Sequence, residues 1–122
     1  MKISPEIEKR FIPWTDGTNY IDYMDLVLLA SIESPREITD PADLHDLNLL
    51  ASQELISFGT TMYRGIQNEI FTIPTSKLTE YGQVVLKYMR SKMDDLSLVA
   101  LQNDANNKIE STNKWLRKNL QL

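Results

Sequence analysis

The chain has 122 residues and a formal net charge of −4; 42% of its residues are hydrophobic and 25% are charged, values typical of one soluble globular domain spanning residues 1–122. It has no cysteine, which excludes disulfides, thiolate nucleophiles and zinc–thiolate sites and fits a reducing compartment. The first residues lack the apolar core of a signal peptide, and the longest apolar run, Leu26 to Ala30, is too short to cross a bilayer. We therefore expect a cytoplasmic protein without a membrane segment.

Charge is distributed unevenly along the chain. Residues 1–63 carry four basic and eleven acidic side chains, a net charge of −7, whereas residues 64–122 carry nine basic and six acidic side chains, a net charge of +3. A polarised surface of this kind would steer a charged macromolecule to one side of the domain. The alternative is that the two halves lie side by side and screen each other.

The first third of the chain predicts two helices. Ser4-Pro5 is a helix-start signal, and Pro13 would end the short helix that follows. A second helix is expected from about Tyr20 to Glu33, with Thr18 or Asn19 as its cap. This second helix is so apolar that we expect it at the centre of the core.

The middle of the chain predicts a helix followed by a β-hairpin. After a short extended segment at residues 36–39, Asp40-Pro41 gives a cap-plus-proline signal for a third helix that runs to about Glu54. Beyond Gly59 the period changes: TTMYR and EIFTI are rich in strand-forming residues and flank GIQN, a plausible hairpin loop.

The last third predicts two more helices. Helical spacing resumes after Thr79, and Asp94 or Asp95 starts a long C-terminal helix with an apolar stripe. The asparagines at 103, 106 and 107 are weak helix formers, so a break near them is the alternative to one continuous helix.

The order helix, hairpin, helix indicates an α+β, mostly helical domain of winged-helix type, with a two- or three-stranded β-hairpin as the wing. Residues 1–93 would form the core module. Residues 94–122 would add the long C-terminal helix, a candidate dimerisation element.

Two motifs carry a family resemblance over roughly residues 20–93. Leu55-Ile56 stands where the wing begins, and Leu78-Thr79-Glu80-Tyr81-Gly82 opens the helix after the wing. Both resemble winged-helix regulators of the multiple-antibiotic-resistance (MarR) type. The resemblance implies a DNA-binding helix-turn-helix made of helices 20–33 and 41–54, with 41–54 as the recognition helix, and a C-terminal helix that dimerises.

The chain departs from that family in two ways. The connector between Glu33 and Pro41 is longer than the usual turn of three or four residues, unless residues 41–56 hold two short helices. The expected recognition helix carries carboxylates and neither Lys nor Arg, which disfavours contact with phosphates. DNA binding is therefore the alternative hypothesis, with these candidate contacts: His45, Asn48, Gln53 and Arg64.

Catalytic and cofactor sites are not indicated. His45 is the one histidine, and on a helix it points away from the face that Asp43 and Asp46 share. Carboxylates at the start of a helix are more simply explained as complements of its positive end. No glycine-rich phosphate loop, nucleophile elbow or paired metal-ligand motif is present, so we expect no enzyme activity, cofactor or metal.

The preferred hypothesis is a non-enzymatic regulatory or interaction protein that binds a basic protein partner through an acidic face. The candidate partner-binding residues are Asp22, Asp25, Asp40, Asp43 and Asp46. A homodimer is also expected, because the C-terminal helix has more apolar length than a small domain needs. The candidate dimer contacts are Leu101, Ile109, Trp115 and Leu116.

Overall fold

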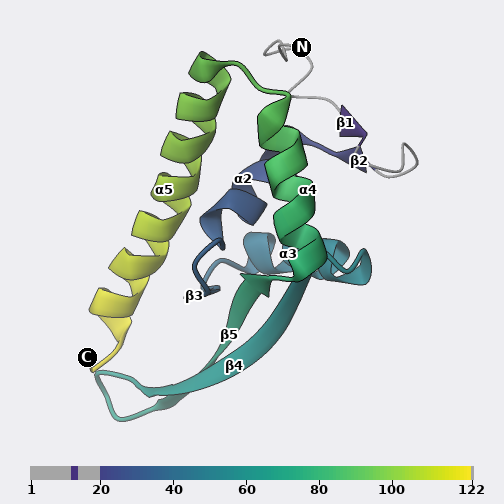
Figure 1. The fold of residues 1–122 in the computed structure, drawn as a ribbon. Coiled ribbons are helices and arrows are strands. Elements are labelled where there is room, and N and C mark those ends of the chain that lie inside the picture. Colours follow the sequence, from purple (N-terminus) through teal and green to yellow (C-terminus); the bar gives the residue numbers. More distant parts are fainter. Residues whose placement is uncertain (1–11, 14–19, 122) are drawn as a thin grey trace.

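The computed structural model describes residues 12–13 and 20–121, and in that part of the chain it holds four helices and two antiparallel sheets (Figure 1). The helices are α2 (Tyr23–Ser31), α3 (Pro41–Ser52), α4 (Glu80–Ser91) and α5 (Asp95–Asn119). The strands are β1 (Ile12–Pro13), β2 (Tyr20–Ile21), β3 (Arg36–Glu37), β4 (Ile56–Arg64) and β5 (Ile70–Leu78). The fold is α+β and mostly helical, as predicted.

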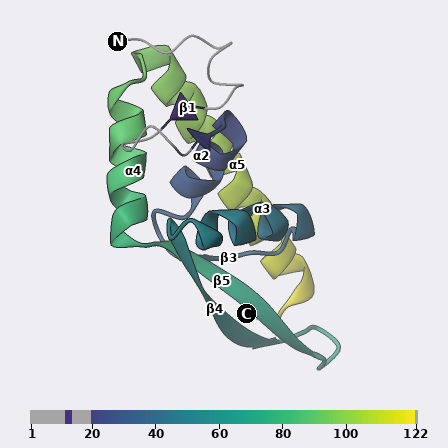
Figure 2. The same cartoon turned by 90° about the vertical axis from the view of Figure 1, so that its right-hand side faces the viewer.

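The larger sheet has three strands in the order β3-β5-β4, so β5 is central and β4 is an edge strand. β4 and β5 pair antiparallel along their whole length, from Ile56↔Leu78 at the base to Arg64↔Ile70 at the tip. The short strand β3, which the sequence predicts as an extended segment, pairs with β5 near its base. The hairpin extends away from the helices, and its tip lies beside the C-terminal end of α5 (Figures 1 and 2).

The main core surrounds α2, whose residues from Leu26 to Ser31 are all buried. Helices α3, α4 and α5 each contribute apolar side chains to the same cluster, and the base of the hairpin adds Ile56 and Leu78. The prediction of a central second helix is confirmed, since a helix that is apolar on all sides must be covered on all sides.

The start of α2 differs from the prediction. The helix begins at Tyr23 because Asp22 caps it, and Tyr20–Ile21 belong to β2 instead. The predicted caps Thr18 and Asn19 lie outside the described residues. Most of the helix predicted near the N-terminus also lies outside them, and its expected end at Pro13 falls in strand β1.

One helix, α3, fills the segment between β3 and β4. It starts at the predicted proline and ends at Ser52, two residues early, and the alternative of two helices within 41–56 is not observed. Glu54 has a left-handed backbone with φ of 65°, which turns the chain out of the helix and into β4.

The Leu-Thr-x-x-Gly motif explains the junction between β5 and α4. The Thr79 hydroxyl accepts a hydrogen bond from the Gly82 N–H at 2.9 Å and donates to the Glu54 carbonyl at 2.6 Å. A Cβ atom on Gly82 would lie 1.9 Å from the Leu55 carbonyl oxygen, so glycine is needed for the helix to approach the strand this closely.

Helix α5 is continuous through its three asparagines and packs at two levels. Leu101 and Ala105 belong to the main core, while Leu116 joins a second cluster formed with the hairpin. In that cluster the rings of Phe71 and Trp115 meet edge to face at 5.4 Å. Packing at both ends holds the helix straight through residues of low helical propensity.

The residues after α5 hold the hairpin tip. Leu120 forms a β-bridge with Gly65, the Gln121 N–H donates to the Arg64 carbonyl at 3.0 Å, and the Ile66 N–H donates to the carbonyl of Asn119 at 3.1 Å. The hairpin is therefore fixed to the end of α5 and is not a freely projecting wing.

Candidate functional site

Asp43, one of the five candidate partner-binding aspartates, lies inside the molecule. Its carboxylate forms an ion pair of 2.7 Å with Lys108 of α5, and its side chain is only 10% exposed. An ion pair that is this well shielded from water joins two elements of the fold. Asp43 is therefore not available on the surface for a partner.

Arg36 is buried next to this pair. Its guanidinium donates to the Ser31 carbonyl at 3.0 Å, to the Ser31 hydroxyl at 2.8 Å and to the Thr112 hydroxyl at 2.8 Å. Burial lowers the pKa of Arg36, and the negative charges of Asp43 and Glu37 oppose that shift. The arginine thus ties β3, the end of α2 and the middle of α5 together.

Asp22 and Asp25 form a capping box at the start of α2. The Asp25 N–H donates to the Asp22 carboxylate at 2.7 Å, and the Asp22 N–H faces the Asp25 carboxylate at 3.5 Å. Burial, followed by the negative charge of Asp22, raises the pKa of Asp25 from 3.8 to about 6. Both carboxylates therefore stabilise the first turn of α2.

Asp40 is exposed and caps α3 by accepting from the Ala42 N–H at 2.9 Å. Asp46 is partly exposed on the same helix. The structure therefore does not gather the five aspartates into one open acidic face: one is ion-paired inside, two form a capping box, and two remain accessible on α3.

The four candidate DNA contacts are all exposed, three of them on or next to α3 and one at the tip end of β4. They are His45, Asn48, Gln53 and Arg64. Arg64 is the one cation among these four residues. Residues 32–40 between α2 and α3 contain a strand where a helix-turn-helix has a tight turn.

The candidate dimer contacts are largely used within the chain. Leu101 is 1% exposed in the main core, and Leu116 is 8% exposed in the second cluster, so neither is on the surface that a dimer contact needs. Trp115 packs on Phe71 and Ile109 is partly exposed. Dimerisation itself stays a prediction, but the apolar length of α5 is explained by its two clusters.

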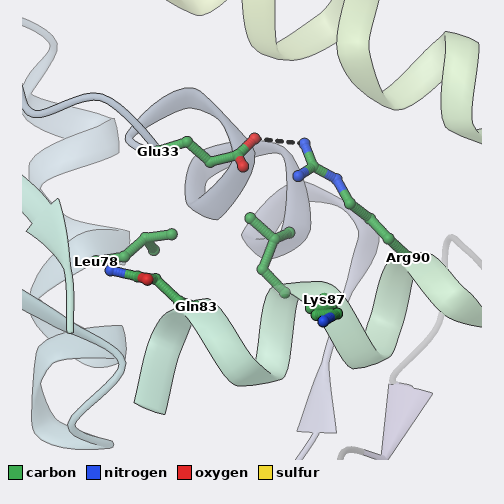
Figure 3. A pocket seen from close by; sticks show the side chains of 6 residues that line it. Glu33, Leu78, Gln83, Lys87 and Arg90 are labelled. Carbon is green, nitrogen blue, oxygen red and sulfur yellow. Dashed lines mark hydrogen bonds and ion pairs between the residues drawn. The ribbon is translucent and has the colours of Figure 1, made fainter. Parts of the chain in front are cut away.

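A surface hollow of about 470 Å³ lies between the end of α2 and α4 (Figure 3). Leu78 and Leu86 line it together with polar side chains, and Glu33 and Arg90 are joined across it by an ion pair of 2.6 Å. No nucleophile–base pair lies in its lining, so we assign no chemistry to it.

The described residues form neither a metal-binding cluster nor a membrane-spanning helix. No group of three or more histidine, cysteine, aspartate or glutamate side chains is placed to hold a metal ion there. None of the helices in residues 20–121 has the combination of length and apolar character that crossing a bilayer demands.

The hairpin exposes four large apolar side chains on its two strands and turn. We call these four side chains the hairpin surface: Phe58, Met62, Ile66 and Ile70. Met62 is 69% exposed and Ile70 is 55% exposed. The strand register puts residues 58, 62 and 70 on one face, because residues two apart on a strand and residues opposite each other share a face.

The opposite face of the hairpin is covered. Tyr63, Phe71 and Ile73 pack against the end of α5, and the Tyr63 hydroxyl donates to the Glu37 carboxylate. That hydrogen bond, more than burial, raises the pKa of Tyr63. From Phe58 to the tip, the hairpin surface is left uncovered by the described chain, whereas Ile56, Ser76 and Leu78 on the same face are buried at the base.

Sequence reasoning did not find the hairpin surface. It predicts strands of five residues where the structure has nine, and it considers only Arg64 among the wing side chains. The signal was the alternation at Phe58, Met62 and Ile70, which is obscured because Ile70 and Phe71 are adjacent and apolar yet lie on opposite faces.

Comparisons with known proteins found no match: no family model, no curated protein and no solved structure resembles this chain significantly.

Proposed function

We propose that the protein is a non-enzymatic binding module whose partner is another protein, and that it contacts this partner through the hairpin surface. The observation that carries the proposal is a strip of large apolar side chains on an edge hairpin, with Met62 at 69% exposure. Several large apolar side chains exposed on one face mark interaction sites in soluble proteins. Burying each such side chain stabilises a complex by about 1–2 kcal/mol.

This contact surface differs from the acidic face that the sequence predicts. Asp43 is ion-paired with Lys108, and Asp22 and Asp25 stabilise the start of α2, so a partner could reach only Asp40 and Asp46 without competing with the fold. A contact built on two exposed carboxylates would be weak and sensitive to salt.

A site-specific photo-cross-linker tests the proposal. The cross-linking amino acid replaces Ile70 in the full chain, and a matched control replaces Val99 of α5, which is 59% exposed. Both variants are expressed in the native cells and irradiated. We expect a discrete cross-linked protein species from position 70 and none from position 99. No species from position 70, or the same species from both, would refute the proposal.

A winged-helix-like arrangement with DNA as the partner is the second candidate. Its support is the helix–hairpin–helix order and the exposure of His45, Asn48, Gln53 and Arg64. The ion pair of Asp43 with Lys108 also removes one of the carboxylates that would repel phosphates. A gel shift on random duplex at low salt, lost in Arg64→Ala and steeply weakened by salt, would favour this candidate over a protein partner.

A further inference from the structure

The backbone of β4 alternates between bonding to β5 and pointing away from it. At the tip the Gly65 N–H donates to the Glu69 carbonyl at 2.7 Å, and at the base the Thr79 N–H donates to the Leu55 carbonyl at 3.1 Å. Residues 55 and 65 therefore face β5. In an antiparallel ladder every second residue does so, and the odd-numbered residues between them share this direction.

The even-numbered residues of β4 consequently direct their N–H and C=O groups to the outer side of the sheet. Arg64 confirms the direction, because its carbonyl accepts the Gln121 N–H, which belongs to no strand of the sheet. We call the outward backbone groups of Phe58, Thr60 and Met62 the open edge. β4 is the last strand of its sheet, and no described strand pairs with these groups.

Natural proteins usually protect such an edge with charge, proline, a bulge or a covering segment. Residues 56–63 contain no charged residue and no proline, and their pairing with β5 is regular. The segment Asn119–Gln121 covers only the tip, opposite residues 64–66. That short pairing also demonstrates that the outer side of β4 accepts an antiparallel backbone.

We propose that the open edge accepts an extended segment of the partner as an added strand, and that this segment carries apolar side chains flanked by carboxylates. The proposal rests on the proposed function and specifies its partner. An added strand would pair with the open edge and place alternate side chains beside Phe58 and Met62 of the hairpin surface.

Charge complementarity selects acidic flanks. Neither β4 nor β5 contains a carboxylate, and each carries one cation: Arg64 at the tip end and Lys77, opposite Ser57, at the base end. Neither cation forms an ion pair with a carboxylate of the described residues. Glu69 in the turn is the only acidic residue between Ile56 and Leu78. A further cation, Lys118, lies in the last turn of α5, the helix to which the hairpin tip is fixed.

A second copy of the chain does not fit the open edge. A symmetric antiparallel pair that uses all three open-edge residues must be centred on Thr60, with Phe58 opposite Met62 of the other copy. This register puts Ile56 of the other copy opposite Arg64, where Gln121 already lies. Moving the centre toward the base brings Glu54, with its left-handed φ of 65°, into the pair. A short free segment avoids both conflicts.

Two synthetic peptides test the proposal on the full chain: acetyl-Asp-Thr-Val-Thr-Val-Asp-amide and the same peptide with lysine at both ends. With its second valine opposite Phe58, the two carboxylates fall opposite Met62, on the face of Arg64, and opposite Ser57, on the face of Lys77. We expect the acidic peptide to bind roughly tenfold more tightly at low salt. Amide exchange measured by NMR should slow at Phe58, Thr60 and Met62 and stay unchanged at Tyr63. Equal affinity, tighter binding of the lysine peptide, or no slowing at the three amides would overturn the proposal.

Thr60→Pro provides the matched variant, since it removes an outward N–H and no bond to β5. It should abolish binding of the acidic peptide. Alternate N-methylation of the peptide gives the same test without altering the protein: one set of methylated amides should abolish binding, and the other should leave it. Binding that survives Thr60→Pro and both methylated sets would contradict strand addition.

The two proposals fail differently. If the cross-link from position 70 forms equally in the Thr60→Pro chain, the hairpin surface binds a protein without strand addition, and only the further proposal falls. If position 70 gives no cross-link, the proposed function falls as well. If the unaltered chain forms a dimer and Thr60→Pro dissociates it, the added strand comes from a second copy of the chain. That result would overturn the proposal of an acidic partner segment.

Discussion

Each of the four described helices begins at a side chain that accepts a hydrogen bond from the first turn. The caps are Asp22, Asp40, Thr79 and Asp94. Three of them are aspartates, so part of the negative charge of the chain is used to start helices. The sequence predicts the cap at Asp40, where proline follows, and it misplaces the cap of α2. Counting carboxylates therefore overstates the acidic surface that a partner can reach.

Asp25 should make stability depend on pH in an identifiable window. Its pKa is raised from 3.8 to about 6, so the folded chain holds this proton more tightly than the unfolded chain. The stabilisation that the bound proton gives the folded state is fully present below pH 3.8 and is lost as the pH rises through about 6. Asp25→Asn should therefore raise the melting temperature at pH 7.5 and lose this advantage below pH 4. The control Asp40→Asn, an exposed cap that asparagine also forms, should not show this pH dependence.

Gly82 should tolerate no side chain. Its substitution by alanine puts a Cβ atom 1.9 Å from the Leu55 carbonyl oxygen, which is backbone and cannot move aside without displacing β4. We expect Gly82→Ala to destabilise the fold by about 3 kcal/mol in urea unfolding, although alanine favours helices. Gly59→Ala is the control, because its Cβ would meet only the Thr75 hydroxyl at 3.0 Å. Equal effects of the two substitutions would contradict the close packing of α4 on β4.

At the scale of elements, the hairpin shows what local pattern can and cannot predict. Strand-forming residues on both sides of GIQN predict the hairpin correctly. Proline is rare inside strands, yet Pro74 lies inside β5. Its missing N–H removes no bond to β4, because its backbone faces the β3 side, where its carbonyl accepts the Ile38 N–H at 2.8 Å. Which side of a strand each residue faces depends on its pairing, and that is not visible in the sequence.

Two neighbouring threonines should respond oppositely to proline. The Thr61 N–H faces β5 and the Thr60 N–H faces the open edge, as the hydrogen bonds at both ends of β4 require. Thr61→Pro should lower the free energy of unfolding by about 2–3 kcal/mol, whereas Thr60→Pro should change it by less than about 1 kcal/mol. Urea unfolding of both variants measures the difference. A larger loss from Thr60→Pro would reverse the assigned direction of the edge.

At the scale of the whole molecule, α5 joins the helical core to the hairpin. Lys108 reaches Asp43 across 65 positions of sequence and Thr112 reaches Arg36 across 76. These separations have no periodic signal, so the sequence predicts the helix and its apolar stripe but not what the stripe covers. Because the sequence does not show what the stripe covers, it predicts Leu101 and Leu116 as dimer contacts, although both are buried within the chain.

The buried ion pair should matter more than an exposed one. Lys108→Met leaves the Asp43 carboxylate, 10% exposed, without its cation, and we expect a loss of about 2 kcal/mol in the free energy of unfolding. Arg117→Met is the matched control, because its ion pair with Glu110 is more than half exposed and should contribute less than about 0.5 kcal/mol. Similar losses from both variants would indicate that Asp43 is not held inside the fold.

The central claim is that the hairpin surface binds a protein, and cross-linking from Ile70 in living cells tests it most directly. The account predicts a defined adduct of this chain with one other protein, absent when the same photoreactive group stands at Val99. An adduct with DNA, or adducts equally abundant from the two positions, would contradict it.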